Sequence, residues 1–229
     1  MPAPTSAPAF GPAFGPAFGP AIKICGINSV PALDAVIAAR AEHCGFVFFP
    51  PSPRHVTLPQ AAELSARAAG RIGRVGLFVD ADDGLIAQAL AGAPLDAIQL
   101  HGKESPERAA QVRARFGLPV WKALAVASAD DVIRARAYLG APDLILFDAK
   151  TPKGTLPGGM GLSFDWNLLA GWKDAAPWAL AGGLTPGNVA EAVRLTRAPL
   201  VDTSSGVESA PGVKDAALID AFCRAARSI

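Results

Sequence analysis

Eight short runs of β-prone residues alternate with amphipathic segments from Ala21 to Ile229. The runs cover residues 22–27, 46–49, 75–80, 97–101, 120–126, 144–148, 178–182 and 200–203, and the segment after each has a composition suited to a helix. Strands that are joined by helices and buried on both faces imply a parallel sheet. Eight such units in a chain of 229 residues predict an α/β protein built as a single closed (β/α)8 barrel near its lower size limit.

An open, doubly wound parallel sheet is the alternative architecture. Such a sheet often carries a GxGxxG turn after its first strand, where it binds a dinucleotide. Here the first strand leads into Cys25-Gly26-Ile27-Asn28 instead. The closed barrel therefore remains the preferred prediction.

Several helix starts are marked by local sequence. Ser105 and Thr185 each place a hydroxyl before a proline, and Ser128 with Asp131 forms a variant of the capping box. The sixth helix has the weakest support, since only residues 164–170 favour it, after a glycine-rich loop.

The first twenty residues differ from the rest of the chain. The tetrapeptide Pro-Ala-Phe-Gly occurs three times in tandem between Pro8 and Gly19, and these residues resist helix and sheet hydrogen bonding. We expect residues 1–20 to be a disordered tail and residues 21–229 to form the catalytic barrel. Docking of the tail phenylalanines on a partner is the alternative role; a flexible appendage without a catalytic part is the simpler one.

The composition excludes several classes of protein. Lysine and arginine number 21 against 20 acidic residues, with no basic block to follow a nucleic-acid backbone. Apolar runs fall short of the roughly 18 residues that a membrane helix needs. Three cysteines without a CxxC pair indicate neither disulfides nor a zinc site, and the uncharged first twenty residues lack the basic start of a secretory signal. We expect a cytoplasmic protein that binds neither membrane nor nucleic acid; the sequence leaves its oligomeric state open.

Polar side chains at the ends of the predicted strands are the candidate site residues. In a barrel of this kind, chemistry occurs at the carboxyl ends of the strands, because the βα loops converge there. This rule selects Cys25 after the first strand, Arg54 beyond the second, His101 at the end of the fourth and Asp148 at the end of the sixth.

The ends of the last two strands predict a phosphate site. Glycines there let backbone N–H groups approach an anion, and serines add hydroxyl donors. The residues concerned are Gly182, Gly183, Ser204, Ser205 and Gly206, and Asp202, at the end of the last strand, is a further candidate for substrate binding. A Gly-Gly pair alone is often only a tight turn, but its occurrence with the serines at strands seven and eight favours phosphate binding.

Cys25 and Asp148 have the character of a separated base and acid. A thiol with a reference pKa of about 8.5 is mostly protonated at pH 7, so a basic role for Cys25 needs help, for example from Lys23. Asp148 must hold a proton to act as an acid; the apolar residues before it favour this, whereas Lys150 opposes it. The alternatives are a small core residue for Cys25 and an N-cap or an ion pair with Lys150 for Asp148.

Arg54 and His101 complete the candidate set. Arg54 follows a proline-rich loop, where its guanidinium can hold a carboxylate through two parallel hydrogen bonds; the alternative is a solvated surface residue. We interpret His101 as a neutral hydrogen-bonding ring near a substrate. A metal role is disfavoured because no second histidine or carboxylate stands beside it at ligand spacing.

Taken in order, eight motifs resemble those of the phosphoribosylanthranilate isomerase family. They are KICG at 23–26, GFVFFPPSPR at 45–54, VGLFVD at 75–80, QLHG at 99–102, LFDAKT at 146–151, GGMGLSFDW at 158–166, LAGGLTPGNV at 180–189 and VDTSSGVE at 201–208. The resemblance covers nearly all of residues 21–229.

The resemblance implies the third step of tryptophan biosynthesis. In that step N-(5-phosphoribosyl)anthranilate undergoes an Amadori rearrangement to 1-(2-carboxyphenylamino)-1-deoxyribulose 5-phosphate, without a cofactor. The family pattern makes Cys25 the base that takes the ribose C2 proton and Asp148 the acid that protonates the ring oxygen. It assigns the anthranilate carboxylate to Arg54 and the phosphate to the loops around Gly182, Gly183 and 204–206.

Two features depart from the family, and two other functions stay open. The proline-glycine repeat matches no family motif, and Leu162 stands where we expect a more polar residue. Another phosphosugar enzyme on the same scaffold, such as a pentose-phosphate epimerase or indole-glycerol-phosphate synthase, is the second hypothesis. Having only three histidines disfavours the epimerase, which would need metal ligands. A non-catalytic binding barrel is the third.

Overall fold

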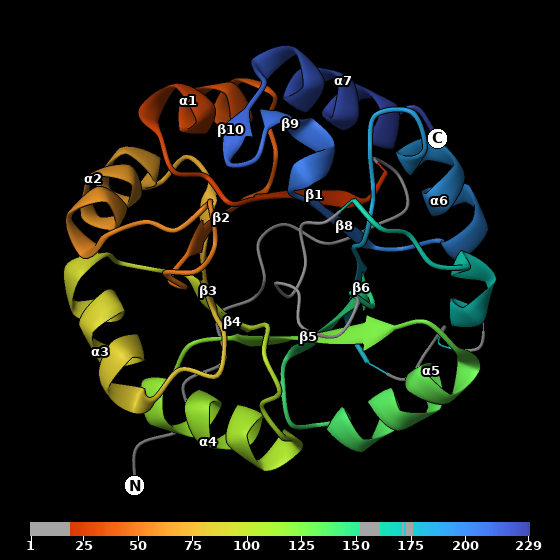
Figure 1. Ribbon diagram of the computed structural model, residues 1–229, viewed down its shortest axis with the longest axis horizontal. Coiled ribbons are helices and arrows are strands. Elements are labelled where there is room, and N and C mark those ends of the chain that lie inside the picture. Colours follow the sequence, from red (N-terminus) through yellow and green to blue (C-terminus); the bar gives the residue numbers. More distant parts are fainter. Residues whose placement is uncertain (1–18, 152–160, 171, 173–175) are drawn as a thin grey trace, which may run out of the picture.

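A closed parallel barrel forms the body of the protein (Figure 1). In this computed structural model, the structure describes residues 19–151, 161–170, 172 and 176–229. The barrel strands are β1 Ala21–Cys25, β2 His43–Val47, β3 Gly73–Phe78, β4 Ala97–Leu100, β5 Val120–Val126, β6 Leu144–Ala149, β7 Trp178–Leu180 and β8 Leu200–Thr203. Because β1 pairs with both β2 and β8, the sheet closes, which confirms the predicted barrel and excludes the open sheet. Most of the repeat tail, residues 1–18, lies outside the described residues.

Helices surround the barrel in Figure 1. They are α1 Val30–Ala38, α2 Leu58–Ala68, α3 Asp83–Gly92, α4 Pro106–Phe116, α5 Ala129–Ala135, α6 Val189–Thr196 and α7 Ala216–Ala226, with a 3₁₀ turn η1 Arg136–Tyr138 after α5. No helix in the part of the chain that the structure describes is long and apolar enough to cross a membrane.

The sixth unit differs from the predicted α-helix over residues 164–170. The structure has a 3₁₀ turn there, η2 Trp166–Leu169, whose start is held by the Asp165 carboxylate accepting a hydrogen bond from Asn167 N at 3.0 Å. A segment this short forms few helical hydrogen bonds for the backbone it must order, so a single tight turn is the favoured outcome.

Two of the three predicted helix starts are confirmed. Ser105 caps α4 by accepting from Arg108 N, and the Asp131 carboxylate accepts from Ser128 N at the start of α5. The start expected at Thr185, with Pro186 as the first helical residue, was wrong, because α6 begins at Val189, three residues after Pro186. The reason is local: Asn188 Oδ1 accepts from Thr185 N at 2.7 Å, which folds 185–188 into a turn before the helix.

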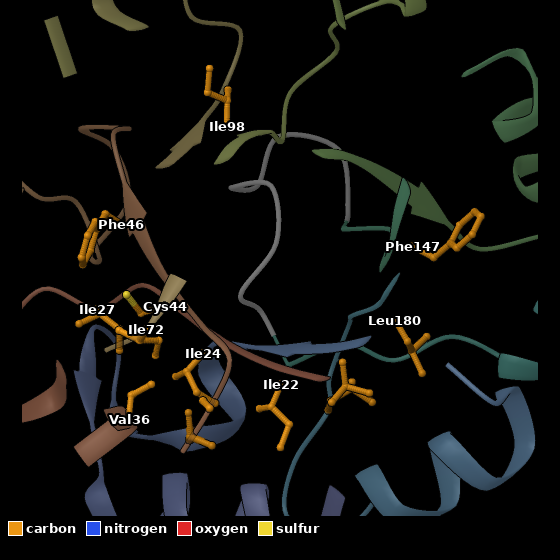
Figure 2. Close-up of a cluster of buried hydrophobic side chains, with 14 of the residues drawn as sticks. Ile22, Ile24, Ile27, Val36, Cys44, Phe46, Ile72, Ile98, Phe147 and Leu180 are labelled. Carbon is orange, nitrogen blue, oxygen red and sulfur yellow. The ribbon is translucent and has the colours of Figure 1, made fainter. Parts of the chain in front are cut away.

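The core has two layers separated by the sheet. Alternate residues of each strand face outward and pack under the helices, as Ile22, Ile24, Cys44 and Phe46 do in Figure 2. The inward-facing residues at the amino ends of the strands form a second apolar cluster, which is filled chiefly by Trp121. This inner cluster fills the half of the barrel at which the strands begin.

An insertion between β8 and α7 covers part of the upper rim, which is the rim formed by the carboxyl ends of the strands. It consists of the 3₁₀ turn η3 Ser205–Val207 and a hairpin of β9 Glu208–Ala210 with β10 Val213–Lys214. Figure 1 shows the hairpin beside β1 and α1. It brings Glu208 and Lys214 to the rim, and the strand count alone did not predict this hairpin.

Candidate active site

One pocket of about 800 Å³, including its open mouth, lies at the carboxyl ends of the strands. Nearly all the predicted site residues line it: Cys25, Arg54, His101, Asp148, Gly182, Gly183, Asp202, Ser204 and Ser205. The fold thus assembles residues from β1, β6, β8 and four loops around a single space.

Cys25 ends β1, with its side chain buried beside two charged residues. Lys23 precedes it by two positions on the inner face of the strand, and the Lys23 ammonium lies 2.9 Å from Asp202 Oδ1. Burial raises the pKa of the Cys25 thiol, whereas the Lys23 charge acts to lower it. Burial also opposes the charge on Lys23, but Asp202 and Cys25 outweigh it and raise the pKa of this lysine. The Lys23 cation therefore offsets part of the effect of burial on the thiol, although the pKa of Cys25 remains above its ordinary value.

Asp148, at the end of β6, lies at one end of a row of three polar side chains. Its Oδ2 is 3.1 Å from His101 Nε2, and Gln99 Nε2 is 2.9 Å from His101 Nδ1. Asp148 Oδ1 accepts a hydrogen bond from Ala149 N at 2.8 Å. The alternative ion pair with Lys150 is wrong, since the Lys150 ammonium lies 3.5 Å from Asp131 instead.

Arg54 lies on the opposite side of the pocket and is held by a residue that the sequence prediction missed. Glu208 accepts two hydrogen bonds from it, from Nε at 2.8 Å and from Nη2 at 2.7 Å. The Lys214 ammonium lies 2.6 Å from the same carboxylate. Burial acts to raise the pKa of Glu208, but Arg54 and Lys214 outweigh it and hold the pKa below its usual range.

These contacts fix the guanidinium in one orientation. Arg54 is only 8% exposed, so the alternative of a solvated surface arginine does not hold. The signal for Glu208 was available as the last residue of VDTSSGVE, an acidic group directly after a glycine-containing turn. Lys214 stands in no motif and had no such signal.

The loops after β7 and β8 form the predicted anion side of the pocket. Gly182 and Gly183 both have positive φ, 86° and 63°, which few other residues adopt at low cost. Ser205 lines the pocket, while the Ser204 hydroxyl donates to Cys25 O at 3.1 Å and so ties this loop to the end of β1. Gly206 has a packing role, because a Cβ there would overlap the carbonyl oxygen of Leu184.

Apolar side chains form a further part of the pocket wall. Val47, Phe49, Leu77 and Val79 come from the ends of β2 and β3, and Leu162 comes from the segment after β6. Leu162, which departs from the expected polar residue, is therefore part of the wall. An aromatic ring bound beside Arg54 would have these side chains to pack against.

Comparison with known proteins decides between the families that share this fold. Residues 22–225 match the family model described as N-(5'-phosphoribosyl)anthranilate (PRA) isomerase. The chain belongs to the phosphoribosylanthranilate isomerase family.

Relatives in this family are similar over almost their whole length. The N-(5'-phosphoribosyl)anthranilate isomerase of Paramagnetospirillum magneticum is 55% identical over 90% of this chain and 96% of its own length. The crystal structure of phosphoribosyl anthranilate isomerase from Thermotoga maritima is 35% identical, with a TM-score of 0.83 over 92% of this chain and all of that chain. Another isomerase structure, in complex with reduced 1-(o-carboxyphenylamino)-1-deoxyribulose 5-phosphate, is 33% identical with a TM-score of 0.81 and the same coverage of both chains. Resemblance by motifs and similarity by whole-chain comparison thus lead to the same isomerase family.

Proposed function

We propose that this chain catalyses the Amadori rearrangement of N-(5-phosphoribosyl)anthranilate to 1-(2-carboxyphenylamino)-1-deoxyribulose 5-phosphate, the third step of tryptophan biosynthesis. The observation that carries the proposal is one pocket that holds a thiol, a carboxyl group, an arginine and two glycine- and serine-rich loops. Names carried by relatives at 55% identity support the same reaction. A phosphosugar that also bears an aromatic carboxylate matches this set of groups.

Binding at both ends would fix the sugar in the middle of the pocket. The phosphate is assigned to the backbone of Gly182, Gly183 and Ser205, and the anthranilate carboxylate to Arg54. Glu208 accepts hydrogen bonds from Nε and Nη2 of Arg54 and so holds the guanidinium in place at the pocket. Such positioning contributes to the rate by holding the reacting atoms in one geometry.

The first chemical step is opening of the furanose ring. Asp148 gives its proton to the ring oxygen as the C1–O bond breaks, and the anilino nitrogen supplies the electron pair that forms the Schiff base. The Asp148 carboxylate that results is stabilised by Ala149 N and, in its Nε2–H form, by His101.

The second step is removal of the C2 proton. The Schiff base makes this proton acidic, and the Cys25 thiolate takes it, which leaves an enolamine. The enolamine becomes the ketone when a proton is returned to C1 and the C2 hydroxyl proton is lost, so the reaction is balanced without an external oxidant or reductant. Each positioned proton-transfer group is expected to contribute about 10²–10⁴-fold.

The test uses freshly generated N-(5-phosphoribosyl)anthranilate and follows the loss of its anthranilate fluorescence. We expect turnover by the wild-type chain. Cys25→Ala and Asp148→Asn should lose most of it while still binding a product analogue. Absence of turnover with tight binding would instead support the binding barrel, and turnover of a pentose phosphate or of the carboxyphenylamino product would support another phosphosugar enzyme.

We also propose that the protein works in the cytoplasm. All three cysteines are free and buried, as suits a reducing compartment. Fluorescence microscopy of a tagged chain checks this location.

A further inference from the structure

Gln99 takes no part in the chemistry described so far, yet it lies behind the proposed acid. It belongs to β4 and is fully buried, and its Nε2 contacts His101 Nδ1 at 2.9 Å. His101 in turn contacts Asp148, while the pocket itself is lined by His101 and Asp148. Gln99 is therefore connected to the acid through the imidazole.

The burial of this amide needs a reason beyond packing. Gln99 Oε1 has no hydrogen-bond partner among the residues that the structure describes. A leucine of similar size at this position would bring no unpaired amide oxygen into the core. The polar contact that the amide does make, to His101 Nδ1, is the feature that a leucine could not supply.

An amide N–H has one chemical consequence for the imidazole. Because Gln99 Nε2 donates, His101 Nδ1 must accept, so the ring proton is on Nε2 and the ring is neutral. His101 then donates to Asp148 Oδ2, and the acid's own proton must occupy a site directed elsewhere, toward the pocket.

The opposite arrangement would disable the acid. With its proton on Nδ1, His101 would accept the Asp148 proton at Nε2 and hold it away from the substrate. With both nitrogens protonated, the ring would be a cation that favours the carboxylate form of Asp148.

We propose that Gln99 is a positioning residue that fixes His101 as the neutral Nε2–H tautomer and so directs the Asp148 proton toward the substrate. The inference rests on the proposed function, because it gives Asp148 the role of acid. In other enzymes, a hydrogen bond at one ring nitrogen of a catalytic histidine sets its tautomer and so the role of the other nitrogen.

The direct test is ¹⁵N NMR of the histidine rings in the full-length, substrate-free protein. We expect a pyrrole-like Nε2 and a pyridine-like Nδ1 for His101, assigned by comparison with His101→Asn. In Gln99→Glu the new carboxylate accepts at Nδ1, and we expect that nitrogen to become protonated. A wild-type His101 protonated at Nδ1 would overturn the inference even if the enzyme is active, whereas loss of the proposed function would show as an inactive wild type.

Kinetics supply the second test, with a matched control. For Gln99→Leu we expect kcat to fall about 10²-fold, the lower end of the contribution of one positioned acid, with little change in KM. The same substitution in a His101→Asn background should have almost no further effect. The matched control is Thr196→Val, which removes a buried polar group on α6. It should leave kcat unchanged. Equal losses from Gln99→Leu with and without His101 would overturn the proposal.

Discussion

The inner faces of the same barrel strands carry two different populations of residues. At the amino ends Ala21, Leu146 and Leu200 belong to one apolar cluster around Trp121. Two to four residues further along the same strands come Lys23, Cys25, Asp148 and Asp202, which are buried but polar or ionisable. The strand period of two keeps both sets on the inner face. Stability and chemistry are therefore separated along the barrel axis, and each half can be altered without rebuilding the other.

The largest contrast is expected on β6. Asp148→Asn should lower kcat about 10²–10⁴-fold, because an amide cannot supply the acid proton, while thermal unfolding changes little. Leu146→Ala, one inward step below, should lower the free energy of unfolding by about 2–5 kcal/mol and leave kcat per folded molecule near wild type. Fluorescence kinetics and calorimetry measure the two effects. An active Asp148→Asn enzyme would contradict the separation of chemistry from stability along the barrel axis.

Two buried cysteines give the next contrast. Cys25→Ala should lose about 10²–10⁴-fold in kcat, since the C2 proton loses its acceptor. Cys44, on the outward face of β2, packs under the helices, and burial raises its pKa to about 12. Cys44→Ala should retain its turnover and lose stability only. Similar losses of kcat in both variants would mean that Cys25 acts merely through packing.

The sequence predicted the architecture well because its signals are local. Runs of β-prone residues and capping patterns such as Ser105-Pro106 act within a few positions, and a barrel follows from repeating them. The start of α6 was predicted wrongly because the Asn188 side chain forms a turn with Thr185 that its residue type alone does not reveal.

The site was predictable only in part. Cys25 and Asp148 stand at strand ends, where the fold gives them a direction. The contacts of Arg54 with Glu208 and of Asp148 with His101 join residues 154 and 47 positions apart, and such pairs depend on how the loops return over the rim. Lys214 reaches Glu208 through a hairpin that the strand count does not require.

The charge beside the thiol can be tested by pH. Burial raises the pKa of Cys25, so kcat/KM should increase with pH as the thiolate forms, with its midpoint above the ordinary value for a thiol. Removing the cation in Lys23→Met should move this limb to higher pH by about one unit, and Lys23→Arg should largely preserve it. If the pH profile is unshifted in Lys23→Met, the Lys23 charge does not act on the pKa of Cys25. Circular dichroism checks that both variants fold.

A smaller effect is expected from the ion pairs. Glu208→Gln should raise KM about tenfold, because one hydrogen bond to a charged group contributes about 1.5–3 kcal/mol and Arg54 loses its fixed orientation. Asp34→Asn breaks a similar two-bond pair with Arg67 on the exposed outer helices. That change should leave KM unaltered and cost at most about 1 kcal/mol of stability. Equal KM values for Glu208→Gln and wild type would show that Glu208 does not contribute to substrate binding.

The smallest change is expected at a residue that does not line the pocket. Gly92 ends α3, and a Cβ there would meet only Leu58 at an ordinary distance of 4.0 Å. Gly92→Ala should increase the free energy of unfolding by about 0.5–1 kcal/mol through the entropy of the unfolded chain. Denaturant unfolding measures this gain, and kinetics should show no change.

A crystal structure of this chain with reduced 1-(o-carboxyphenylamino)-1-deoxyribulose 5-phosphate tests the central claim most directly. We expect the phosphate at Gly182, Gly183 and Ser205 and the aromatic carboxylate at Arg54. The sugar C2 should then lie about 3–3.5 Å from the Cys25 sulfur, with Asp148 on the oxygen derived from the ring. A ligand bound in the reverse direction, or with C2 beyond reach of Cys25, would contradict the account.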